Sequence, residues 1–179
     1  MINRYCQYME VGFLFEIGDK IVYPMQGAGV IEAIDEKEIQ GEKKRYCTIK
    51  LPINKMQIMI PMEKIENTSI RSIVDNSTLE RAFRIFHNGE SDESLTYKER
   101  YKVNTDKMKT GKIQESIEVI RDLLHLNRDK KLNTNEMEML RNARKCLVSE
   151  VELIKGIPEN QANDLLESRI ESLEAKRFF

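Results

Sequence analysis

The side chains that usually carry out acid–base, nucleophilic or metal chemistry are few in this chain of 179 residues, and they stand far apart. The two histidines, His87 and His125, fall in different predicted segments, and neither is spaced from a carboxylate or a cysteine as in known catalytic sets. The three cysteines, Cys6, Cys47 and Cys146, are odd in number and widely separated, which argues against a disulfide framework and a zinc site. We therefore expect no enzyme activity, no cofactor and no metal ion, and a reducing cytoplasm as the compartment.

The segment Gly27–Gly29 has the glycines that a phosphate-binding loop requires. Such a loop leads into a helix whose N-terminus holds the phosphate, but the residues that follow here are typical of a strand. We therefore interpret the segment as a backbone bend at positive φ. The sequence also has no G-x-x-x-x-G-K-[ST] motif for binding ATP. The neighbouring acids Asp35 and Glu36 are expected to be ordinary solvated charges at the end of a strand.

Charge is distributed unevenly along the chain, although the net charge is only −1. Residues 95–147 hold 13 Lys and Arg against 8 Asp and Glu, a net charge of +5. Residues 1–94 hold 12 against 15, and residues 148–179 hold 4 against 7, so each of these two segments has a net charge of −3. A basic middle segment indicates a surface for a polyanion, with a solvated set of helices as the alternative.

Residues 15–61 contain short apolar runs rich in Ile, Val and Tyr, with turn residues between them. The even spacing of these runs predicts a small, strongly bent β-sheet or partial barrel with strands at Lys20–Tyr23, Gly29–Ala33, Tyr46–Leu51 and Gln57–Ile60. Pro61 closes the last run, as is typical of an edge strand. Met59 either fills the core or, because methionine adapts to many partners, contributes to a binding surface.

The rest of the sequence has the periodicity of helices. Capping boxes are expected at Ser77-x-x-Glu80, before a short helix, and at Thr96-x-x-Glu99, before a helix that ends at Gly111. Further helices are expected over residues 112–127, from Asn133 to about Ile154, and after the Gly156–Pro158 break. Together they predict a helical bundle.

The predicted fold class is α+β with two domains. We expect an extension at residues 1–14, either poorly ordered or the product of a misassigned start. A β-rich domain at 15–75, a helix and linker at 76–94, and a helical domain at 95–179 follow. Ile65, Ile70, Ile73 and Val74 are expected to pack under the sheet.

The β-rich segment resembles the RNA-polymerase-interacting domain of the CarD/CdnL family of bacterial transcription regulators, which also occurs in the transcription–repair coupling factor. The matching motifs are, in order, Gly18–Pro24, Gly27–Glu32, Tyr46 and Met56–Pro61. The resemblance implies a Tudor-like sheet that pairs an edge strand with the β subunit of RNA polymerase. The residues implied in this contact are Lys37, Arg45, Tyr46, Met59 and Pro61. Because some relatives have arginine at the positions of Lys37 and Met59, we expect the contact at Met59 to be mainly apolar.

A second resemblance covers Tyr97–Asn104, which is similar to the W-S-x-R-Y-K-x-N segment of the same family. It implies that the helical domain contacts promoter DNA without sequence specificity, through the minor groove and the backbone, at the upstream edge of the melted bubble. Tyr97 stands where relatives have a wedging tryptophan, and a phenol offers less stacking area than an indole. The basic residues implied in phosphate contacts are Arg100, Lys102, Arg121, Arg141, Arg144 and Lys145.

The sequence thus predicts a non-enzymatic, cytoplasmic regulator that modulates the stability of the promoter open complex. Its partners would be the β subunit and promoter DNA, with no membrane and no small-molecule substrate. No apolar run approaches the roughly 18 residues that a membrane span needs, and the N-terminus has no clear signal peptide. The alternative is a polymerase-bound adaptor whose helical domain binds another protein instead of DNA.

Overall fold

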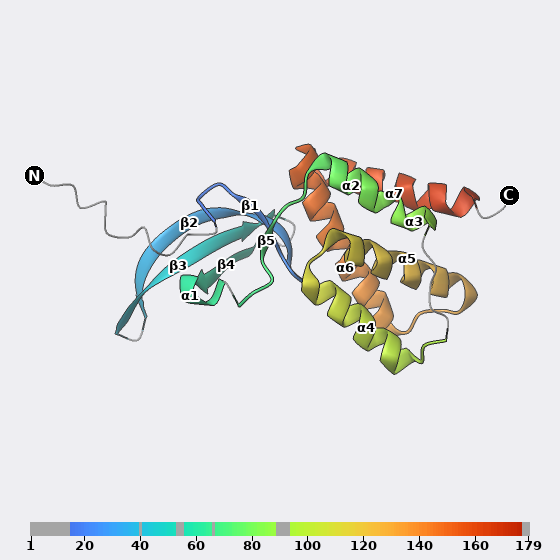
Figure 1. Ribbon diagram of the computed structural model, residues 1–179, viewed down its shortest axis with the longest axis horizontal. Coiled ribbons are helices and arrows are strands. Elements are labelled where there is room, and N and C mark those ends of the chain that lie inside the picture. Colours follow the sequence, from blue (N-terminus) through green and yellow to red (C-terminus); the bar gives the residue numbers. More distant parts are fainter. Residues whose placement is uncertain (1–14, 40, 53–55, 66, 89–93, 177–179) are drawn as a thin grey trace, which may run out of the picture.

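The computed structural model describes residues 15–39, 41–52, 56–65, 67–88 and 94–176. The predictions that concern residues 1–14, including Cys6, lie outside this part of the chain. Figure 1 shows a curved sheet at one end of the molecule and a group of helices at the other. The predicted α+β class and its order, sheet first and helices second, are confirmed.

The sheet is antiparallel, with the strand order β4-β3-β2-β1-β5. Its strands are β1 (Lys20–Tyr23), β2 (Gly27–Ile39), β3 (Glu42–Leu51), β4 (Met56–Pro61) and β5 (Arg71–Ser72). All the predicted strands are confirmed. β5 was not predicted, because a strand of 2 residues is too short to show any alternation. Within the described residues the sheet stays open, with β4 and β5 at its edges.

The β2–β3 ribbon extends well beyond the predicted strands. Its outer part carries oppositely charged pairs across the strands, Glu36 opposite Arg45 and Glu38 opposite Lys43. Such pairs stabilise a two-stranded ribbon that is exposed to solvent on both faces. The alternation of apolar residues that predicts strands is missing in this outer part. The predicted strands therefore ended at Ala33 and began again only at Tyr46.

The predicted bend at Gly27–Gly29 was wrong in its position. The turn between β1 and β2 lies at Pro24–Gln26, where Met25 has a φ of 66°. Gly27 has positive φ, but it already belongs to β2. Gly29 is needed for another reason: a Cβ there would collide with the carbonyl of Lys50 and lie 2.8 Å from Cδ2 of Leu51.

The core of the sheet lies under one face and is closed by Phe15 and by the short helix α1 (Met62–Ile65). The side chains in it include Ile21, Ile31, Ile49, Leu51 and Ile60. Ile65 and Ile70 join this core, as predicted. Val74 does not, because the chain has already turned toward the helices there and Val74 packs against their core.

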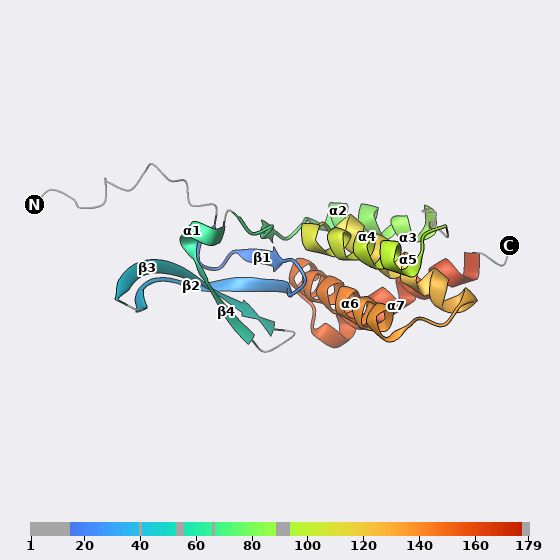
Figure 2. The same ribbon diagram turned by 90° about the horizontal axis from the view of Figure 1, so that it is seen from below.

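The helical domain consists of α2 (Asn76–Phe83), α3 (Ile85–Asn88), α4 (Tyr97–Thr110), α5 (Ile113–Asp129), α6 (Thr134–Lys155) and α7 (Glu159–Lys176). Figure 2 shows them in two layers, with α6 and α7 under α2 to α5. The helices share one apolar core, which includes Phe86, Ile117, Leu123, Leu147 and Leu166. No helix in the described part of the chain combines the length and apolar character needed to cross a membrane.

The helix ends confirm three predicted signals and correct one. Thr96 and Glu99 form a capping box at α4, Asn133 caps α6, and Gly111 ends α4 at a φ of 69°. The predicted box of Ser77 and Glu80 was wrong. Asp75 caps α2 instead, because its carboxylate accepts from the Thr78 amide at 2.7 Å and from the Ser77 hydroxyl at 2.7 Å.

Candidate functional site

The outer face of the sheet gathers most of the predicted docking residues. Tyr46 lies opposite Pro61 on β4 and opposite Asp35 on β2, so these side chains share one face. Met59 lies opposite Thr48 on the same face and is 47% exposed. The Lys37 ammonium donates a hydrogen bond to the Met59 sulfur at 3.0 Å. Lys37, Tyr46, Met59 and Pro61 therefore form one surface, which we call the outer-face cluster.

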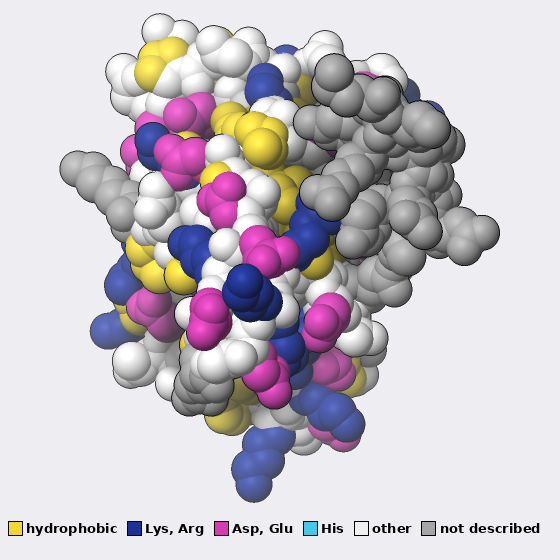
Figure 3. Space-filling view, turned by 90° about the vertical axis from the view of Figure 1, so that its left-hand side faces the viewer, with side chains coloured by type: hydrophobic (Ala, Val, Ile, Leu, Met, Phe, Trp, Pro, Cys, Tyr) yellow, Lys and Arg dark blue, Asp and Glu magenta, His cyan; other side chains and the backbone are white. Residues whose placement is uncertain are grey.

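Arg45 does not belong to this cluster. It precedes Tyr46 in β3, and neighbouring side chains in a strand point to opposite faces. Its cross-strand partner is Glu36 on the charged ribbon. Figure 3 shows the ribbon end of the sheet domain, where Lys, Arg, Asp, Glu and hydrophobic side chains are intermingled.

β4 carries Met59 and Pro61 of this cluster and is also an edge strand of the sheet. It is the last strand on its side of the described sheet, so the outer row of its backbone groups faces away from β3. An edge strand of this kind can accept a strand from another chain. The outer-face cluster and the edge are therefore adjacent.

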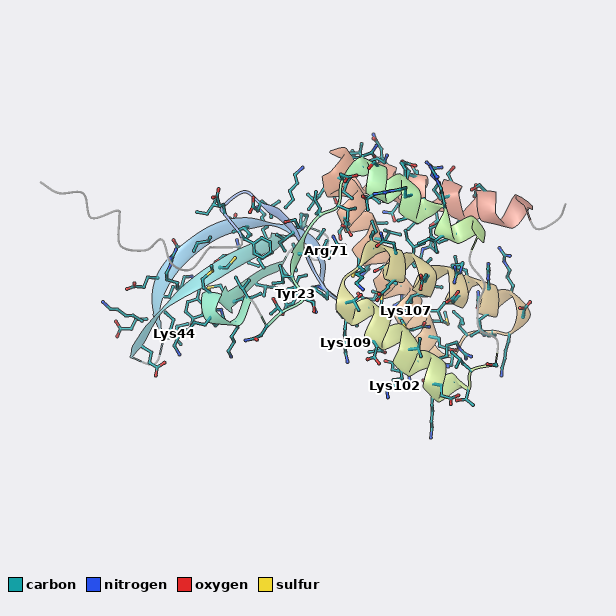
Figure 4. All side chains as sticks on the ribbon, in the orientation of Figure 1. Tyr23, Lys44, Arg71, Lys102, Lys107 and Lys109 are labelled. Atoms are coloured by element: carbon teal, nitrogen blue, oxygen red, sulfur yellow. The ribbon has the colours of Figure 1, made fainter. Side chains whose placement is uncertain are left out.

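A second exposed surface lies on α4. The rings of Tyr97 and Tyr101 are 38% and 39% exposed, and their centroids are 6.1 Å apart at an angle of 44°. The side-chain amide of Asn135, on α6, donates a hydrogen bond to the Tyr97 hydroxyl at 3.0 Å. Lys98 and Lys102 are exposed beside them. Figure 4 places Lys102, Lys107 and Lys109 along this helix.

Arg100 and Arg121 are engaged in ion pairs of the helical domain, and their contact with phosphate stays a prediction. Arg100 donates from Nε and Nη2 to Oε1 of Glu136 at 2.9 Å and 2.6 Å. Arg121 is only 4% exposed and donates to the Asp122 carboxylate at 2.9 Å and 2.7 Å. A phosphate could reach these guanidinium groups only by breaking buried ion pairs. Residue type and net charge carry no information about this orientation.

The remaining predicted cations lie on one side of α6 and border a groove of about 450 Å³ between α5, α6 and α7. Arg141, Arg144 and Lys145 line it together with the apolar side chains Leu132, Met137, Leu140 and Val148. Arg141 is exposed and pairs with Glu138 at 2.8 Å. Arg144 pairs with Glu167, and burial lowers the pKa of its guanidinium.

The two domains are joined by an ion pair that the sequence did not predict. Arg71, on β5, donates from Nη1 and Nη2 to the two carboxylate oxygens of Glu150, on α6, at 2.7 Å and 2.9 Å. Its Nε donates to the carbonyl of Gly111 at 2.8 Å. Glu150 is 3% exposed. The partners are separated by 79 residues, so no local spacing could have revealed them.

Other polar contacts place α6 firmly against the β1–β2 turn. The Ala28 amide donates to the Ser149 hydroxyl at 2.8 Å, and the Asn142 amide donates to the carbonyl of Met25 at 3.2 Å. The Lys20 ammonium donates to the carbonyl of Leu153 at 2.9 Å. These bonds fix the orientation of the outer-face cluster relative to the exposed rings of α4.

Where the structure describes them, the side chains first considered for chemistry lie in separate places. Cys47 lies in the core of the sheet and Cys146 on α6, and both are free thiols. Burial, together with the nearby Glu150 carboxylate, raises the pKa of Cys146 to about 12, so this thiol is protonated at neutral pH. His125 is buried in α5, and the side chain of His87 lies outside the described part of the chain.

Comparison with known proteins matches both domains in turn. Residues 15–74 match the CarD-like/TRCF RID domain, and residues 81–167 match the C-terminal domain of CarD. The chain belongs to the CarD-like family. The CarD-like chain is 53% identical over 148 residues to the "Putative transcription factor YdeB" of Bacillus subtilis (strain 168). This match covers 83% of the present chain and 97% of the relative.

The solved structures include the solution NMR structure of the 72-residue N-terminal domain of Myxococcus xanthus CarD. It is 33% identical, covers 32% of this chain and 77% of its own, and has a TM-score of 0.28. The two matched domains and the close relative make this CarD-like protein a transcription regulator.

Proposed function

We propose that this CarD-like protein docks on the β subunit of RNA polymerase through the β4 edge and the outer-face cluster. Its helical domain then contacts promoter DNA near the upstream edge of the bubble and modulates the stability of the open complex. The observation that carries the proposal is the arrangement of Lys37, Tyr46, Met59 and Pro61 on one face beside β4, an edge strand of the described sheet. Arg45 contributes only from the opposite face of the ribbon.

The DNA contact rests on the exposed side chains of the helical domain. Tyr97 and Tyr101 supply flat rings for a base or a kinked base step, and Lys102 supplies a cation for a phosphate. Arg141 and Lys145, on α6, add exposed charges. Arg100 and Arg121 support the packing from inside and Arg144 is held by Glu167, so these residues have indirect roles.

The effect on the promoter follows from differential binding. A ligand shifts an equilibrium only by the difference in its affinity for the two states. A preference of about 1–3 kcal/mol for the open complex would raise its occupancy roughly 5- to 150-fold while it is the minor state.

The first experiment is a binding measurement between the full-length protein and the isolated lobe of the polymerase β subunit. We expect a stable complex, and its absence would overturn the proposed docking. The lifetime of the open complex is then measured with and without the protein on a supercoiled promoter. An unchanged lifetime would remove the proposed effect on DNA while leaving the docking intact.

A second candidate function, an adaptor that recruits another protein, is favoured by the groove between α5, α6 and α7. Its apolar lining, including Met137 at 47% exposed, suits a protein segment better than a phosphate backbone. The dependence of binding affinity on salt concentration distinguishes the two functions. Phosphate contacts would make binding to fork DNA fall with salt, with a log–log slope of about −0.9 per contact on duplex DNA. A salt-insensitive complex would favour the adaptor.

A further inference from the structure

The N-termini of α4 and α6 are joined by a shared carboxylate. Glu136 completes the capping box of α6 by accepting from the Asn133 amide at 3.3 Å, and its other oxygen accepts from Arg100 of α4 at 2.6 Å. Glu136 is 3% exposed. Because ion pairs and caps at this depth tolerate little movement, the first turns of the two helices form one rigid support.

Tyr97 and Asn135 lie at the exposed rim of this support. The bond from the Asn135 amide ends on the Tyr97 hydroxyl, at the far end of the ring. Tyr101, one turn later, lies next to this ring, with the two ring planes tilted by 44°. A tyrosine that has a hydrogen bond at its hydroxyl and a second ring beside it is restricted in rotation before any ligand binds.

We infer that Asn135 is a positioning residue, which holds the ring of Tyr97 in the orientation that contacts DNA. The inference rests on the proposed function, since it assigns a role at the same DNA-contacting surface. Rigid groups bind more tightly than free ones because their ordering entropy is already lost. A phenol has less stacking area than an indole. The bond from Asn135 to the Tyr97 hydroxyl offsets part of the affinity that this smaller area would cost, because it fixes the ring from a neighbouring helix.

Asn135 suits a mutational test because it has no part in the cap of α6. The cap uses Asn133 and Glu136, whereas Asn135 is exposed and its side chain reaches α4. Replacing it by alanine should leave the thermal midpoint of unfolding unchanged. Asn163, which is exposed on α7 and bonds to the Glu159 carbonyl at 3.0 Å, provides the matched control.

The experiment is a double-mutant cycle with the full-length protein, polymerase holoenzyme and a promoter that carries 2-aminopurine at the upstream edge of the bubble. The variants are Asn135→Ala, Tyr97→Phe and the two combined, with Tyr97→Ala and Asn163→Ala as references. Open-complex lifetime and 2-aminopurine fluorescence are both recorded, because a loss of packing alone would not change the fluorescence of that base.

We expect Asn135→Ala and Tyr97→Phe each to reduce the gain in lifetime by about two- to tenfold, the range for one hydrogen bond. The combined variant should be no worse than either, because both changes remove the same bond. If the losses of Asn135→Ala and Tyr97→Phe added in the combined variant, the inference would be overturned. It would also be overturned if Asn135→Ala were fully active while Tyr97→Ala was inactive. Neither result would affect the proposed DNA contact. Full activity of Tyr97→Ala would instead overturn the proposed DNA contact on which the inference rests.

Discussion

Arg71 and Glu150 face each other across the domain interface and share two parallel hydrogen bonds of 2.7 Å and 2.9 Å. The pair does more than join two side chains. Arg71 also reaches the end of α4 through the Gly111 carbonyl, and Glu150 accepts from the Val74 amide at 3.3 Å. The sheet, the segment between β5 and α2, α4 and α6 therefore meet at this one charge pair.

Arg71→Ala should lower the free energy of unfolding by about 3–5 kcal/mol, because it leaves the Glu150 carboxylate buried without its partner. The measurement is urea denaturation followed by circular dichroism. Glu138→Ala is the control, since it breaks the exposed pair with Arg141 and should cost less than about 1 kcal/mol. Equal losses in the two variants would show that the interface pair contributes no more than a surface pair.

Met59→Asp should weaken binding to the polymerase β lobe about tenfold or more, because it places a charge in an apolar contact. Met56→Asp is a closely matched control. It changes the same residue type in the same strand at the same exposure of 47%, but three positions away and therefore on the other face. If both variants bound as tightly as the wild type, the outer-face cluster would not be the docking surface.

Asp75→Ala should lower the thermal midpoint of unfolding, because α2 loses the carboxylate that caps it. Ser77→Ala should cost much less, because the Ser77 hydroxyl only donates to the Asp75 carboxylate. Thermal unfolding of the two variants checks this order. A larger loss for Ser77→Ala would restore Ser77 as the capping residue.

Stability should fall as the solution is acidified, in part through Glu80. The hydrogen bond from Lys155 outweighs the cost of desolvation, and with Arg169 nearby it lowers the pKa of Glu80 below the ordinary value of 4.5. A carboxyl group with a lowered folded-state pKa stabilises the protein above 4.5, and this contribution is lost as the pH falls through the folded-state value.

In Glu80→Gln, the difference in stability between about pH 7 and pH 3 should therefore be smaller than in the wild type. Urea midpoints across this range provide the measurement. A Glu138→Gln variant controls for general charge effects, because Glu138 is exposed. The same pH profile for Glu80→Gln and the wild type would mean that Glu80 gains nothing from its partners on α6 and α7.

Local patterns in the sequence predicted local structure well. The apolar runs located β1 to β4, and Thr96, Glu99 and Asn133 located the starts of α4 and α6, because these signals act within a few residues. The charged ribbon of β2 and β3 was missed, since its strands are stabilised by pairs such as Glu36 and Arg45 that only the folded register brings together.

The candidate site was predictable only in part. The resemblance indicated Tyr46, Met59 and Pro61, and strand alternation then decided that they share a face and that Arg45 does not. Arg100 could not be told from a surface cation, because its buried carboxylate partner Glu136 becomes a neighbour only when the helices pack. Arg121 pairs with the adjacent Asp122, and only the packing of α5 buries its side chain. Arg71 and Asn135 were missed for the same reason, since each acts on a partner in another element.

α6 connects the sheet to the ring of Tyr97 as a single continuous helix of 22 residues. Ser149 is bonded to the sheet and Asn135 to Tyr97, and the helix between them spans about 21 Å at 1.5 Å per residue. One inserted residue would turn Asn135 about 100° away from Tyr97, whereas seven would restore its direction and add about 10 Å. Under the proposed docking, the length and the helical phase of α6 would together set the point on the promoter that Tyr97 can contact.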